Sequence, residues 1–183
     1  MNRLHPIDPA TAEGKSKTLL DAVKASLGGT PNMFRLLAAS PTTLEAYLSF
    51  NRALSQGALP ARIREQIALV SAETNGCDYC ASAHTVLGKR AGLNQDDIAN
   101  ALDGSAADPK ADAAIRFAKL LLEKRGHISD ADFSQLQTVG FSEAEIAEIV
   151  AHVALNVFTN YFNIAMDTEI DFPVVRTQQP KAA

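Results

Sequence analysis

The sequence contains only two cysteines, few signs of β-strands and no cluster of basic residues. A secreted domain held together by disulfides would carry more cysteines, spaced to close long loops. The scattered Lys and Arg residues and the net charge of −4 argue against nucleic acid or an anionic membrane surface as a partner. What remains is an ordinary globular composition in 183 residues, which is enough for one domain with a hydrophobic core.

The chain also lacks export and membrane signals. Residues 1–15 have no apolar stretch of the kind found in a secretory signal. The most apolar stretch, residues 146–166, contains Glu148, His152 and three asparagines, which are costly inside a bilayer. We therefore expect this stretch to be a buried helix of a cytoplasmic protein that has no membrane partner.

Helix signals recur along the whole chain. Gly, Pro and capping residues separate predicted helices at about 17–27, 31–38, 41–56, 60–74, 77–92, 94–102, 109–126, 129–139 and 142–166. We expect an all-α fold with an irregular lead-in over residues 1–15, one helical domain over 16–172 and a mobile tail over 173–183. The last helix is apolar on more than one face, so it is either central in the monomer or buried between subunits.

The two cysteines, Cys77 and Cys80, lie only three residues apart. A disulfide between them closes almost no loop and contributes little to stability, so the pair calls for a chemical role. Cys77 follows the helix-ending pair Asn75-Gly76 and therefore stands at the start of the next helix. Unpaired backbone N–H groups and the helix dipole favour a thiolate at that position.

A histidine and a glutamate complete the candidate site. His84 falls on the same helical face as the cysteines and is four residues after Cys80, so those two side chains can touch. If Asn75-Gly76 reverses the chain, Glu65 on the preceding helix reaches the height of His84 and can orient its imidazole. The pattern predicts a redox-active thiol site in which Cys80, His84 and Glu65 are nucleophile, base and orienting group.

Other interpretations of these residues stay open at this point. The cysteines could be two small buried residues without chemistry. Cys77, Cys80, His84 and Glu65 could bind zinc, although adjacent turns of one rigid helix seldom surround a tetrahedral ion well. The remaining candidate side chains have simpler interpretations: His152 as a packed core histidine and Tyr79 as a packing or interface residue.

The string EQIALVSAETNGCDYCASAH, from Glu65 to His84, has the spacing E-x11-C-x-Y-C-x3-H. It resembles the motif of the alkyl hydroperoxide reductase D-like (AhpD-like) branch of the carboxymuconolactone decarboxylase superfamily. The segments LPARIREQIALV and NVFTNYFNIAMDTEIDFP resemble the peroxidase-related subgroup of that superfamily. The resemblance implies an all-α helical bundle with the CxxC at the start of a core helix, usually assembled into trimers or hexamers.

The resemblance also implies a function. Cys80 matches the cysteine that attacks a hydroperoxide, Cys77 matches the resolving cysteine, and Glu65 and His84 match the proton relay. No organic cofactor or metal is implied, and an external lipoyl- or thioredoxin-like dithiol would reduce the disulfide. Tyr79 departs from the family pattern, which has a relay histidine there. The alternative function is therefore dithiol–disulfide exchange or redox sensing without efficient peroxide turnover.

Overall fold

The computed structural model describes residues 2–178, which contain nine α-helices and no strand. In chain order the helices are α1 (Gly14–Leu27), α2 (Asn32–Leu37), α3 (Pro41–Ser55), α4 (Ala61–Asn75), α5 (Asp78–Arg90), α6 (Gln95–Asp103), α7 (Pro109–Glu123), α8 (Asp130–Thr138) and α9 (Glu143–Ala165). The predicted all-α fold is confirmed. Each helix lies within a few residues of its predicted range, because the capping residues that mark the ends in the sequence also bound the helices in space.

The helix ends show why these segments form. Ser142 accepts a hydrogen bond from the N–H of Glu145, and the Glu145 carboxylate accepts one from the N–H of Ser142, so the predicted capping box is present. Gly76 ends α4 with φ of 70°, a left-handed conformation that is unstrained only for glycine. This glycine turns the chain sharply from α4 into α5.

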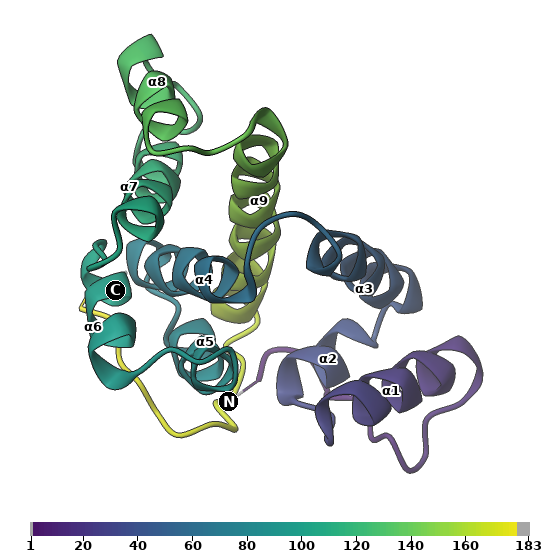
Figure 1. The fold of residues 1–183 in the computed structure, drawn as a ribbon. Coiled ribbons are helices and arrows are strands. Elements are labelled where there is room, and N and C mark those ends of the chain that lie inside the picture. The colour runs from purple at the N-terminus through teal and green to yellow at the C-terminus, as the bar shows by residue number, and fades with distance from the viewer. Residues whose placement is uncertain (1, 179–183) are drawn as a thin grey trace.

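Helix α4 lies at the centre of the molecule, where it packs against α5, α6, α7 and α9 (Figure 1). Its residues from Gln66 to Ala72 are all buried. One hydrophobic cluster joins α4 to α6, α7, α8 and α9, and a second joins α1, α2 and α3 to the cysteine end of α5. The start of α5 therefore lies where the second cluster meets the central helix.

The C-terminal segment runs from α9 back along α5 towards α6 (Figure 1). Ser82 Oγ and the backbone N–H of Val175 are 2.9 Å apart, and Asp78 accepts hydrogen bonds from residues 176 and 177. The expected mobility of residues 173–183 stays a prediction: residues 175–177 bond to the first half of α5 and Gln178 bonds to Glu73 on α4, while residues 179–183 lie outside the described part of the chain. No helix between residues 2 and 178 is long and apolar enough to span a membrane.

Candidate active site

The two cysteines lie at the N-terminal end of α5. They form a disulfide with a Cα–Cα distance of 5.3 Å, and their exposed fractions are only 1% for Cys77 and 3% for Cys80. Cys77 is the N-cap residue, and its sulfur accepts a hydrogen bond from the backbone N–H of Cys80 at 3.3 Å. Cys77 therefore lies at the start of the helix, as expected, and a backbone N–H group points at its sulfur.

Glu65 and His84 form a hydrogen bond between α4 and α5. His84 Nδ1 lies 2.8 Å from Glu65 Oε2, and each side chain is 22% exposed. The contact exists because Gly76 reverses the chain, so that the first half of α4 lies beside the middle of α5. Gly88, one turn after His84, faces the Cβ of Glu65 and the side chain of Leu93, and its missing side chain allows close packing there. Since Nδ1 is engaged with the carboxylate, Nε2 is the ring nitrogen left to exchange a proton.

This arrangement links a buried dithiol to partly exposed groups that can carry a proton. Cys80 and His84 are one turn apart on α5, and Glu65 fixes the imidazole from the neighbouring helix. An imidazole held by a carboxylate is the usual means of taking a proton from a weakly acidic nucleophile. Cys80 therefore lies one helical turn from an imidazole that is held by a carboxylate.

The sequence did not reveal two neighbours of the site. Asn163, on α9, donates a hydrogen bond from Nδ2 to the sulfur of Cys80 at 3.4 Å and is 3% exposed. Tyr47, on α3, lies near enough to Glu65 for the carboxylate to affect it: burial, and then the charge of Glu65, raise the pKa of Tyr47 to about 12. In the sequence, Asn163 stands out only as one of several polar residues in an otherwise apolar helix. The packing of α9 against α5 is what brings it to Cys80.

Tyr79 has a structural role. It is 5% exposed, its hydroxyl oxygen accepts a hydrogen bond from the N–H of Met33 at 3.1 Å, and its ring meets the edge of Phe172. Burial, with the nearby Asp171 carboxylate adding to it, raises the pKa of Tyr79 far above that of a free phenol. These contacts join α5 to α2 and to the C-terminal segment through Tyr79.

The other candidates lie elsewhere. His152 is 5% exposed on α9, in keeping with a core histidine. The zinc interpretation gains no support, because no three His, Cys, Asp or Glu side chains between residues 2 and 178 gather in a group that could hold a metal ion.

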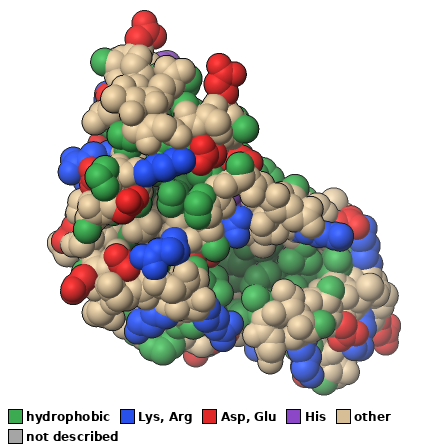
Figure 2. All heavy atoms as spheres, in the orientation of Figure 1, with side chains coloured by type: hydrophobic (Ala, Val, Ile, Leu, Met, Phe, Trp, Pro, Cys, Tyr) green, Lys and Arg blue, Asp and Glu red, His purple; other side chains and the backbone are tan. Residues whose placement is uncertain are grey.

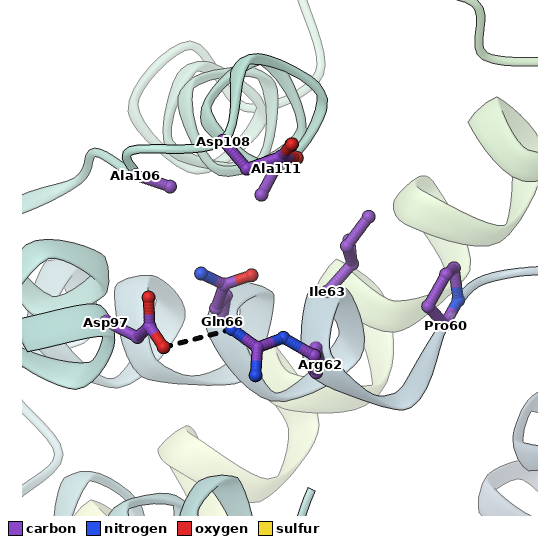
Figure 3. Close-up of a pocket in the computed structure, with 8 residues that line it drawn as sticks. All are labelled: Pro60, Arg62, Ile63, Gln66, Asp97, Ala106, Asp108 and Ala111. Carbon is purple, nitrogen blue, oxygen red and sulfur yellow. Dashed lines mark hydrogen bonds and ion pairs between the residues drawn. The ribbon is translucent and has the colours of Figure 1, made fainter. Parts of the chain in front are cut away.

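A cavity of about 210 Å³ lies between α4, α6 and α7 (Figure 3). Gln66 points into it, and an ion pair between Arg62 and Asp97, 3.0 Å apart, closes one side. Its lining contains no cysteine or histidine. Although Gln66 follows Glu65 in the sequence, it projects from a different face of α4, so this hollow is separate from the thiol site.

Comparison with known proteins identifies the central part of the chain. Residues 41–123, from α3 to α7, match the model of the carboxymuconolactone decarboxylase family, and this stretch contains Glu65, both cysteines and His84. The match to this family covers the stretch that carries the motif. The resemblance inferred from the motif is therefore confirmed.

Solved structures show the same fold over almost the whole chain. An uncharacterized peroxidase-related protein from Ralstonia eutropha JMP134, with an AhpD core, is 22% identical, with a TM-score of 0.85 over 93% of this chain and 92% of that one. One from Silicibacter sp. TM1040 is 21% identical, with a TM-score of 0.80 over 92% and 91%. The debrominase Bmp8, solved as a cysteine-to-alanine variant in complex with 2,3,4-tribromopyrrole, is 23% identical, with a TM-score of 0.79 over 92% and 91%. No curated protein matches the chain.

Proposed function

We propose that the protein is a thiol peroxidase that reduces hydroperoxides through a Cys77/Cys80 dithiol–disulfide cycle. The observation that carries the proposal is the hydrogen bond between His84 and Glu65, one helical turn from Cys80, in a chain whose only two cysteines are paired. The match of residues 41–123 to the carboxymuconolactone decarboxylase family model, together with the resemblance of the CxxC motif to the AhpD-like branch, supports it.

The cycle is balanced with these residues and one external dithiol. His84, held by Glu65, accepts the thiol proton of Cys80. The thiolate attacks the distal oxygen of the hydroperoxide, so an S–O bond forms and the O–O bond breaks. The leaving alkoxide takes the proton from His84 and departs as the alcohol. The thiol of Cys77 then attacks the sulfenic acid, so a disulfide forms and water leaves. An external lipoyl- or thioredoxin-like dithiol reduces this disulfide by exchange and is itself oxidised.

The burial of both sulfurs favours small reactants. Exposed fractions of 1% and 3% leave little open surface at either cysteine for a folded, thioredoxin-like partner. A small hydroperoxide, and a reductant carried on a slender arm such as a lipoyl group, fit this burial better. Dithiol exchange with a protein, or redox sensing without turnover, is therefore the second candidate.

The surroundings of the relay favour an organic hydroperoxide. Figure 2 shows a hollow lined largely by hydrophobic side chains between the part formed by α1 to α3 and the rest of the molecule. Aromatic rings connect α3 and α9: the ring centroids of Tyr47 and Phe158 are 6.3 Å apart, and those of Phe158 and Phe162 are also 6.3 Å apart. A hydrophobic hollow and aromatic rings of this kind would offer apolar contacts to an organic substituent on the peroxide.

Self-association is part of the proposal. Helix α9 exposes Val150, Phe158, Tyr161 and Ile164, with exposed fractions between 39% and 59%. Large apolar side chains on one helix of a monomer often mark an interface. A homo-oligomer, a trimer or hexamer by the family resemblance, would cover them, and light scattering that gives the mass of one chain would rule this out.

The decisive experiment compares two single-cysteine variants in a peroxide-consumption assay with dithiol-reduced protein. We expect Cys77→Ser, reduced and then freed of dithiol, to consume one equivalent of hydroperoxide and to retain a sulfenic acid on Cys80, because no resolving thiol is left to convert it to a disulfide. Cys80→Ser should consume hydroperoxide far more slowly than the parent. If Cys80→Ser turns over as fast as the parent, the mechanism is wrong. If the parent itself reacts no faster than a free thiol, dithiol exchange becomes the better assignment.

A further inference from the structure

The sulfur of Cys80 has a hydrogen-bond donor from outside its own helix. Asn163, on α9, places its Nδ2 group 3.4 Å from that sulfur, and its side chain is 3% exposed. The sulfur of Cys77 instead receives the backbone N–H of Cys80 at 3.3 Å. We propose that Asn163 is a catalytic residue that stabilises the thiolate of Cys80 and thereby makes Cys80 the attacking thiol. The second half of this statement rests on the proposed peroxidase function.

A buried thiolate needs such a donor. Burial in apolar surroundings raises the pKa of a thiol, because the protein replaces the water that would hydrate the anion. At 3% exposure, Cys80 has little water to hydrate its charged form. A side-chain amide can donate to the anion without changing its own charge, and hydrogen bonds to charged groups are the stronger ones. His84 can accept the proton, while Asn163 holds the charge that remains.

The buried amide of Asn163 destabilises the fold, so a functional role explains its presence better than packing does. Its Oδ1 atom is buried and has no hydrogen-bond partner within residues 2–178, so the Nδ2 contact with Cys80 is the one hydrogen bond of the side chain there. An unsatisfied buried carbonyl costs stability, and an apolar side chain of similar size would avoid that cost. The position therefore has an amide where packing alone favours leucine.

Two other buried asparagines of α9 show how specific this contact is. Asn156 donates to the backbone oxygen of His152, which is a local helix contact. Asn160 accepts a hydrogen bond from Asn75 at 2.9 Å, and so fixes the end of α4 just before the turn. In the described chain these amides bond to oxygen and nitrogen partners, whereas Asn163 bonds to sulfur, so Asn156 is a natural control for Asn163.

The test measures thiol pKa rather than peroxide turnover. In a Cys77→Ser background, Cys80 is the only thiol, and serine keeps an oxygen acceptor at the helix N-cap. The rate of alkylation by iodoacetamide as a function of pH then reports the pKa of Cys80. We expect Asn163→Leu to raise this pKa by about one pH unit, which means about tenfold less thiolate at a pH below both values. Asn163→Asp should raise it further, because an ionised carboxylate would repel the thiolate.

Two controls separate a direct effect from a change in packing. Asn156→Leu in the same background should leave the pKa of Cys80 unchanged. Asn163→Leu in a Cys80→Ser background should leave the pKa of Cys77 unchanged, because that sulfur has a different donor. Asn163→Ser, which is smaller and keeps a hydroxyl donor, replaces the leucine variant if that one fails to fold, and should give a smaller rise.

The outcomes are distinct. Equal Cys80 pKa values with asparagine and leucine at position 163, or an equal rise for Cys77 and Cys80, would overturn the proposal. Alkylation needs no hydroperoxide, so its result stands even if the parent protein proves inactive toward peroxides. Conversely, a peroxidase whose Cys80 pKa ignores Asn163 would keep the proposed function and lose only this inference.

Discussion

Helices α5 and α9 pack against each other, and both bury polar side chains, but the partners of those side chains differ. On α5, Asp78 and Ser82 hold the C-terminal segment, and His84 holds Glu65. On α9, His152 Nε2, Asn160 Nδ2 and Asn163 Oδ1 are buried without a hydrogen-bond partner in the described chain. Apart from Thr85, whose buried hydroxyl has no partner in the described residues, the polar groups of α5 named above are paired around a defined site. The orphaned groups of α9 reduce stability, and of these residues Asn163 reaches that site.

The largest effect is expected from the paired histidine of α5. His84→Asn removes the group that accepts the Cys80 proton, so peroxide consumption should fall by about 10²- to 10⁴-fold, the usual contribution of a general base. The side chain is mostly buried, at 22% exposed, and is bonded to Glu65, so urea unfolding of the variant checks that the lost rate is not a lost fold. Initial rates with a limiting hydroperoxide and excess dithiol measure the effect.

Thr85 offers the matched control on the same helix. It is 8% exposed, and its Oγ1 has no partner in the described residues, so Thr85→Val removes an orphaned hydroxyl from the residue next to His84. We expect an unchanged rate and equal or slightly higher stability. A loss in His84→Asn no greater than in Thr85→Val would mean that α5 does not supply the base.

The orphaned histidine of α9 should make stability depend on pH. Burial, and then the charge of Arg64, lower the pKa of His152 to about 4, while the nearby carboxylates of Glu148 and Glu65 oppose this. The unfolded chain binds this proton near pH 6.5 and the folded chain only near pH 4, so the unfolded state holds more protons between those values. The stability contribution is complete above pH 6.5 and is lost as the pH falls towards 4, by about 2–3 kcal/mol.

Urea unfolding at pH 7 and pH 4 checks this dependence. His152→Leu should reduce the difference in the free energy of unfolding between pH 7 and pH 4 by that amount, because no histidine remains at this position to bind a proton on unfolding. His127, which is exposed, gives the control: His127→Gln should leave the pH dependence as it is in the parent. An identical pH dependence in the parent and in His152→Leu would show that the α9 histidine is not held neutral by burial.

Sequence reasoning reached the parts of the fold and site that depend on local pattern. Caps such as Ser142 with Glu145 marked the helices, and helical spacing placed His84 on the face of the cysteines. The contact of Glu65 with His84 also followed, because a single glycine turn joins the two helices and their register can be counted outward from it. These predictions needed only short-range geometry.

The rest depends on contacts between distant segments. Asn163 is 83 residues from Cys80, and Arg176 is 98 residues from Asp78, so no periodicity relates them. The asparagines of α9 were evident as polar residues in an apolar helix, but which of them meets the sulfur depends on how α9 rotates and slides against α5. The same holds for the end of the chain, whose polar composition indicated a mobile tail while Asp78 supplies partners for it.

Asp78 gives the smallest and most local test of the comparison. This carboxylate, 7% exposed, accepts hydrogen bonds from Arg176 Nη1 at 2.7 Å and from the backbone N–H and hydroxyl of Thr177 at 2.9 and 2.8 Å. Arg176 is 64% exposed, so most of the stabilisation should come from Thr177 rather than from the ion pair. Asp78→Ala should lower the free energy of unfolding by about 1–2 kcal/mol and speed tryptic cleavage after Arg176.

Asp96, an exposed acidic residue in the first turn of α6, gives the control for this last effect. Asp96→Ala removes a similar favourable charge at a helix start but releases no segment, so its cleavage rate should match the parent. Equal cleavage rates in all three proteins would mean that Asp78 does not hold the segment after Pro173. The paired polar groups of α5 would then serve the thiol site alone.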